Sequence, residues 1–180
     1  EGAAIAHRRA AIRSARLWAP SSWRGALGGL TIYDEALAPE AMAPAMERFG
    51  IDAALVVGAD WALVDPALCD AVMERHLEKP ERHRLAFCQA APGLAGCVVD
   101  RHVMTDLAKA SSGAGVFASL GGLLGFLPVR PKADPIATPV CVQVAPAVRD
   151  AGLRFAADTK HGAALITHLS RTLGAEWTQA

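Results

Sequence analysis

Apolar residues along the first half of the chain are spaced in two ways, at helical intervals and in short continuous runs. Pro39 suits a first helical turn and Gly50 suits a helix end, because glycine adopts positive φ readily. Between them three apolar residues recur at helical spacing: Met42, Met46 and Phe49. Residues 52–58 (Asp-Ala-Ala-Leu-Val-Val-Gly) then form an apolar run, which is typical of a strand covered on both faces. The pattern predicts a helix and then a central strand.

The dipeptide Asp65-Pro66 marks the start of a second helix, since aspartate caps a helix and proline fits its first turn. One face of this helix carries five apolar residues: Leu68, Cys69, Val72, Met73 and Leu77. We expect residues 84–89 to form the next strand, residues 91–96 a loop, and residues 97–99 to lead into a short helix. The predicted order is therefore strand, helix, strand, loop, helix.

Further elements are predicted toward the two ends of the chain. Residues 3–17 have the spacing of a helix, and residues 30–33 suit a short strand. Near the C-terminus, residues 140–144 and 154–157 predict strands, and residues 161–173 predict a closing helix. This alternation predicts an α/β fold with a mostly parallel sheet and helices on both faces, in a single domain that spans the whole chain.

The composition is that of a globular chain with no excess charge of either sign. Of the 180 residues, 52% are hydrophobic and 20% charged, and the 18 basic side chains balance the 18 acidic ones. No nucleic-acid partner is expected, because no net positive charge would attract a polyanion. The apolar runs are shorter than the ~20 residues that span a bilayer, so we expect no membrane segment and a cytoplasmic protein. The four cysteines form no Cys-x-x-Cys pair, which predicts buried free thiols.

Two aspartates stand out because each follows a predicted strand and precedes a predicted helix. These are Asp60 and Asp158. Ligands of open α/β sheets gather at the carboxyl ends of the strands, so we expect both carboxylates at one edge of the sheet. There they could hold Mg²⁺, which takes one or two carboxylates and completes its shell with water and substrate phosphates. The alternative is that Asp60 caps a turn and Asp158 caps the last helix.

Residues 58–66 (Gly-Ala-Asp-Trp-Ala-Leu-Val-Asp-Pro) resemble the Gly-Asp-x-Pro-Leu-(Ile/Val)-x-Pro segment of GT-A type nucleotidyltransferases, notably the cytidylyltransferases that activate the sugar acid KDO. Residues 155–159 (Phe-Ala-Ala-Asp-Thr) resemble that family's second segment, and the likeness extends over residues 30–173. It implies a Rossmann-like, GT-A type fold in which Asp60 and Asp158 are catalytic and ligate Mg²⁺. It also implies an acceptor-side loop with four substrate-binding residues: Gln89, Pro92, Gly93 and Gly96.

The chain departs from this family pattern in several places. The family begins with a strand and a Leu-Ala-Ala-Gly-x-Gly-x-Arg-like loop that holds the nucleotide, and no such sequence occurs here. We therefore expect the domain to be N-terminally incomplete and the full-length protein to hold a further domain. Ala62 stands where the first family segment has proline. Lys160, directly after Thr159, stands where the second family segment has proline.

Two functions follow as hypotheses. In the first, the domain catalyses Mg²⁺-dependent nucleotidyl transfer from a nucleoside triphosphate to a sugar or another small-molecule acceptor. In the second, it is a catalytically inactive GT-A-like domain that binds a ligand or partner within a larger protein. The missing glycine-rich loop favours the second hypothesis, whereas the two aspartate segments favour the first.

Overall fold

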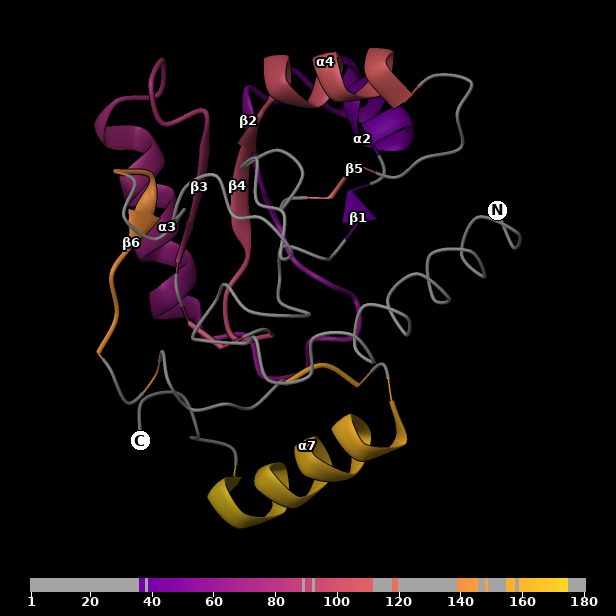
Figure 1. Ribbon diagram of the computed structural model, residues 1–180, viewed down its shortest axis with the longest axis vertical. Helices are drawn as coiled ribbons and strands as arrows, with labels where there is room; N and C mark the ends of the chain where they lie inside the picture. The colour runs from indigo at the N-terminus through magenta and orange to yellow at the C-terminus, as the bar shows by residue number, and fades with distance from the viewer. Residues whose placement is uncertain are drawn as a thin grey trace, which may run out of the picture.

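The computed structural model describes residues 36–37, 39–88, 90–91, 93–111, 118–119, 139–145, 148, 155–157 and 159–174. Their helices are α2 (Pro39–Arg48), α3 (Pro66–Glu78), α4 (Arg101–Ser111) and α7 (Lys160–Leu173). Their strands are β1 (Ala36–Leu37), β2 (Ala53–Val56), β3 (Leu85–Cys88), β4 (Cys97–Asp100), β5 (Ala118–Ser119) and β6 (Cys141–Val142). Figure 1 shows α2 and α4 together at one end of the molecule and α7 at the other. The elements predicted at residues 3–17 and 30–33 lie outside the described residues.

Four of the strands form one sheet in the order β2-β4-β3-β6. β4 pairs antiparallel with β2 on one side and with β3 on the other, whereas β6 pairs parallel with β3. It follows that β2, β3 and β6 run in one direction and β4 runs in the other. β1 and β5 form a separate antiparallel pair.

Helices cover both faces of this sheet, as the apolar runs predict. On one face, a single cluster joins α2 and α4 to the strands through Met46, Met104, Phe87 and Val99. On the other face, α3 packs against the strands in a cluster that includes Val72, Ala86, Cys88 and Val98. Successive residues of β3 and β4 therefore enter opposite clusters. The α/β class is confirmed by these helices on both faces. A strand that is covered on both faces has a continuous apolar sequence.

The expected mostly parallel sheet is wrong for the described strands, which pair mainly antiparallel. The sequence pattern predicted residues 97–99 only as a lead into a helix, whereas β4 is a strand of four buried residues. The connection from β3 to β4 covers residues 89–96, so it is eight residues long (97 − 88 − 1). A parallel connection needs about a dozen residues or more, and the chain must therefore reverse direction here.

Helix boundaries follow the predicted chemistry closely. Asp65 caps α3 by accepting a hydrogen bond from the Ala67 amide at 2.8 Å, and Pro66 occupies the first turn. Gly50 follows α2 with a φ of 63°, as expected of a helix-ending glycine. Phe49, however, is 69% exposed, so the apolar face of α2 ends at Met46.

The predicted apolar face of α3 is wrong at its C-terminal end. Met73 and Leu77 are exposed, whereas His76 is buried. The His76 ring donates from Nδ1 to the His83 carbonyl oxygen at 2.8 Å, and the His83 ring donates from Nδ1 to the Arg75 carbonyl oxygen at 2.6 Å. Because carbonyl oxygens only accept, both rings carry a proton on Nδ1. This pair joins the end of α3 to the segment before β3, and it explains why a polar ring replaces the expected apolar contacts.

The prediction of a strand at residues 154–157 is also wrong for its described part. Residues 155–157 form no strand, and the Ala157 amide instead donates to the carbonyl oxygen of Asp60, in the loop after β2, at 2.8 Å. This segment therefore lies beyond the end of the sheet and leads into α7. None of the described helices combines the length and the apolar character needed to cross a bilayer.

Candidate functional site

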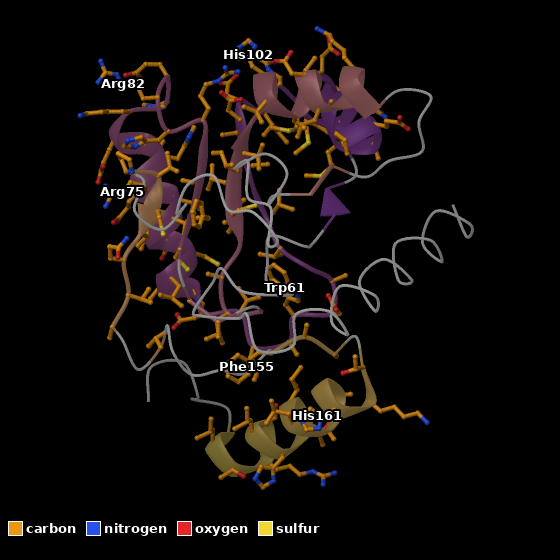
Figure 2. The ribbon with its side chains drawn as sticks, in the orientation of Figure 1. Trp61, Arg75, Arg82, His102, Phe155 and His161 are labelled. Atoms are coloured by element: carbon orange, nitrogen blue, oxygen red, sulfur yellow. The ribbon has the colours of Figure 1, made fainter. Side chains whose placement is uncertain are left out.

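Three chain segments meet at the edge of the sheet where β2 and β3 end. They are the loop after β2, the loop after β3 and the segment that precedes α7. The Asp65 amide donates to the Leu94 carbonyl oxygen at 2.7 Å and so joins the first two loops, while the bond from Ala157 to Asp60 joins the first to the third. A small apolar cluster fills the space between these segments and α7: Leu63, Ala91, Phe155 and Ile166. Figure 2 shows Trp61, Phe155 and His161 in succession from the sheet toward α7.

Asp60 lies in a tight turn directly after β2. The Trp61 amide donates to the Gly58 carbonyl oxygen at 3.1 Å and closes this turn. Asp60 is half-buried, and its carbonyl oxygen is held by the Ala157 amide. Trp61 is 7% exposed, and its indole folds back over the turn. A Cβ atom on Gly58 would lie 2.5 Å from the indole nitrogen, so a glycine at this position makes room for the ring.

The segment that carries Asp158 is fixed on both sides of that residue. Ala157 bonds to the Asp60 carbonyl oxygen, as described above, and Thr159 caps α7 by accepting a hydrogen bond from the Gly162 amide at 3.0 Å. Gly162 is buried because the chain passes so close to the Ala156 carbonyl oxygen that a side chain would collide with it. Asp158 itself lies outside the described residues, and the pairing of the two carboxylates stays a prediction.

The predicted acceptor-side loop is described at Gly93 and Gly96, whereas Gln89 and Pro92 lie outside the described residues. Gly93 has a φ of 91° and packs against the backbone of Phe155, where a Cβ atom would collide with the carbonyl group. A Cβ atom on Gly96 would lie 2.6 Å from the Val56 carbonyl oxygen. Both glycines thus permit close backbone packing between the three segments. Their role in substrate binding stays a prediction.

The oxygen donors near this edge suit a hard cation better than a soft one. Within the described part of the chain, no three side chains of histidine, cysteine, aspartate or glutamate gather closely enough to enclose a metal ion. A Mg²⁺ site does not need three, because the ion keeps several waters and binds substrate phosphates. Asp60 supplies one carboxylate near this edge, and its sharing of a Mg²⁺ ion with Asp158 stays a prediction.

The four cysteines are buried free thiols, as predicted, and offer no nucleophile to this edge. Burial raises the pKa of the Cys88 thiol to about 12, with smaller contributions from the nearby Cys69 and Asp65. Burial likewise raises the pKa of Cys97 to about 12. A thiol with so high a pKa is protonated at neutral pH and is a poor nucleophile and metal ligand.

Trp61 is the residue of this site that sequence reasoning missed. The motif-like run drew attention to Asp60, and Trp61 filled a variable position of that run. A signal was nonetheless present, because a tryptophan three residues after an apolar run that ends in glycine is placed to close the end of the core. Comparison with protein-family models, with curated proteins and with solved structures finds no significant match to this chain.

Proposed function

We propose that this chain is a GT-A-like nucleotidyltransferase domain that binds a nucleoside triphosphate with Mg²⁺ at the edge where β2 and β3 end. In this proposal, Asp60 and Asp158 supply the carboxylate ligands, and the acceptor is a sugar or another small molecule. The observation that carries the proposal is the 2.8 Å hydrogen bond from the Ala157 amide to the Asp60 carbonyl oxygen. It brings together the two segments whose sequences resemble the metal-binding segments of that family.

The direction of the strands supports the location. β2 and β3 run the same way, so the loops that follow them lie at the same edge, and ligands of α/β sheets bind at such carboxyl ends. The N-terminus of α7 faces the same region and carries no acidic residue in its first turn, but it does carry Lys160 and His161. A helix N-terminus with basic residues favours an anion such as a phosphate group.

Each residue has a stated task in this proposal. Asp60 and Asp158 would hold the cation, and the bound ion would offset negative charge on the phosphates. The Thr159 cap and the close packing of Gly162 against Ala156 fix the direction of α7 at its N-terminus. The four buried free thiols are typical of a reducing compartment, which supports a cytoplasmic setting.

Calorimetry of the full chain with CTP, ATP, GTP or UTP, each with Mg²⁺, tests this proposal. We expect one nucleotide to bind only when Mg²⁺ is present, and we expect Asp60→Asn and Asp158→Asn to weaken that binding at least tenfold. Asp52→Asn is the matched control, because Asp52 precedes β2 at the opposite edge of the sheet and its side chain is 89% exposed. No heat with any of the four nucleotides, or equal binding by all variants, would exclude this function.

The second candidate is a GT-A-like domain that binds its ligand without turnover. Ala62 and Lys160, which replace the prolines of the family segments, favour this second function. Release of pyrophosphate separates the two functions. Nucleotide binding without pyrophosphate release, over a panel of sugar and sugar-acid acceptors, would support the binding domain, and release that depends on Asp60 would support the enzyme.

A further inference from the structure

The indole nitrogen of Trp61 is a buried hydrogen-bond donor without an acceptor. Trp61 is 7% exposed, and its Nε1 atom has no hydrogen-bond partner among the residues that the structure describes. Arg75 Nε is the other side-chain atom of this kind in the part of the chain that the structure describes, and it lies on α3, far from Asp60 in sequence. Buried donors are nearly always paired, since an unpaired one forfeits its bonds to water. The Trp61 nitrogen therefore needs an explanation.

The orientation of the indole ring suggests why its N–H group has no partner. Its ring belongs to the core cluster that also holds Phe87 and Val99, whereas its nitrogen edge faces Gly58. The three ring atoms nearest to the position of a Gly58 Cβ atom are Nε1, Cε2 and Cδ1, at 2.5, 2.6 and 2.8 Å. The core thus holds the ring, and the N–H group is turned toward the turn that carries Asp60.

Within the described residues, two backbone hydrogen bonds hold this turn in place. Its own bond is the one from the Trp61 amide to Gly58, and Asp60 is held to the rest of the molecule by the Ala157 amide. Gly58, at the start of the turn, has no Cβ atom and tolerates a wide range of backbone angles. A small movement of residues 58–60 away from the ring would uncover Nε1 while the ring stays in the core.

We propose that Trp61 Nε1 donates a hydrogen bond to a phosphate oxygen of the ligand that binds beside Asp60, and that the turn of residues 58–61 opens to let this oxygen in. The proposal rests on the proposed function for the identity of the ligand. An indole N–H group only donates, so its partner must be an acceptor and cannot be a cation. An anionic oxygen is the strongest acceptor available. In the closed turn the indole N–H group is unpaired, whereas in the open turn it is paired with the ligand. The ligand therefore binds the open state more tightly than the closed state, which is what a shift between two states requires.

The test combines NMR and calorimetry on the full chain labelled with ¹⁵N. Trp61→Phe assigns the Trp61 indole signal by its disappearance, and the other three tryptophans serve as internal references. The probes are the four nucleoside triphosphates and inorganic tripolyphosphate, each with Mg²⁺. We expect the Trp61 N–H proton to move downfield on binding, and Trp61→Phe, which keeps a ring in the core, to bind about tenfold more weakly. Its urea midpoint should fall only modestly, because the smaller ring leaves a small cavity but no hydrogen bond is lost.

The outcomes separate this inference from the proposed function. If a nucleotide binds but the Trp61 signal stays in place, or Trp61→Phe binds equally well, the inference is overturned and the proposed function stands. If tripolyphosphate moves the Trp61 signal but no nucleotide binds, the inference stands and the proposed function fails. If no probe moves the signal, the inference is overturned. A lower urea midpoint of Trp61→Phe with unchanged affinity would show that the ring serves the core alone.

Discussion

Gly93→Ala tests the close contact between the loop after β3 and the segment before α7. Gly93 has a φ of 91°, which costs an alanine about 1–2 kcal/mol. Its missing side chain also leaves room for the Phe155 carbonyl group, and a methyl group forced into such a place costs about 1–3 kcal/mol more. Because the obstacle is backbone, it cannot rotate away. We expect a total loss of about 3 kcal/mol, which corresponds to roughly 6–12 °C in Tm for a chain of this size.

Gly50→Ala is the matched control for Gly93→Ala. Gly50 has a φ of 63°, and a Cβ atom there would meet nothing within 4 Å. This variant therefore measures the cost of the backbone angle alone, which should lower the free energy of unfolding by about 1 kcal/mol. Urea unfolding followed by circular dichroism measures both variants. Equal losses would refute the reasoning, since they would show that the contact with Phe155 adds nothing to the cost of a positive φ.

Other predictions follow from the caps, ion pairs and thiols. Asp100→Ala should lower the free energy of unfolding in urea by about 2–3 kcal/mol, because this buried carboxylate pairs with Arg84 and caps α4. Asp52→Ala, in an exposed ion pair with Arg101, should lower it by under about 1 kcal/mol. Equal losses would contradict this difference. Cys88 and Cys97 should resist iodoacetamide at pH 8 in the folded protein, as read by mass spectrometry, and alkylation as fast as in urea would exclude their burial. Since folding raises the pKa of both thiols from about 9 to about 12, their contribution to stability is complete below pH 9 and is lost as the pH rises toward 12. Thr159→Ala should remove about 1 kcal/mol and speed hydrogen exchange in α7 but not in α3; uniform acceleration would contradict a local cap.

Local chemistry made the helix boundaries predictable from the sequence. Asp65 and Pro66 begin α3 as expected, because a cap and a proline act within one turn and need no distant partner. His76 shows the limit of this approach. Its polar ring is accommodated on the buried face of α3 because the His83 carbonyl oxygen, seven residues along the chain, accepts a hydrogen bond from Nδ1. A periodicity argument that counts apolar residues misses such a polar pair.

The sheet topology was harder to predict because an apolar run carries no information about strand direction. β2 and β4 are both short and mostly apolar, yet they run in opposite directions. The length of the connection between β3 and β4 does carry that information, and a count of its residues would have predicted the reversal. Pairing partners such as Val56 and Cys97 are 41 residues apart (97 − 56), and no local pattern specifies them.

The candidate site was predictable in part. The position of Asp60 after an apolar strand is confirmed, and so is a helix directly after Thr159. The sequence predicted that the segments of Asp60 and Asp158 meet because both would follow strands at one edge of the sheet. In the structure a hydrogen bond from Ala157 to Asp60 joins these segments, and residues 155–157 form no strand. The burial of Trp61 depends on the whole core cluster, which no short motif describes.

The way in which α7 is attached has a consequence for the thermodynamics of the site. Among the described residues, this helix buries Gly162 and Ile166 and is otherwise partly or fully exposed. A helix with so small a buried surface belongs to the least stable part of a domain, and it can detach in a local unfolding step while the sheet stays folded. Each such step would carry Thr159 away from Asp60. The local unfolding free energy of α7 would then set the fraction of molecules in which the two segments lie together, and a ligand that bridges them would slow hydrogen exchange in this helix first.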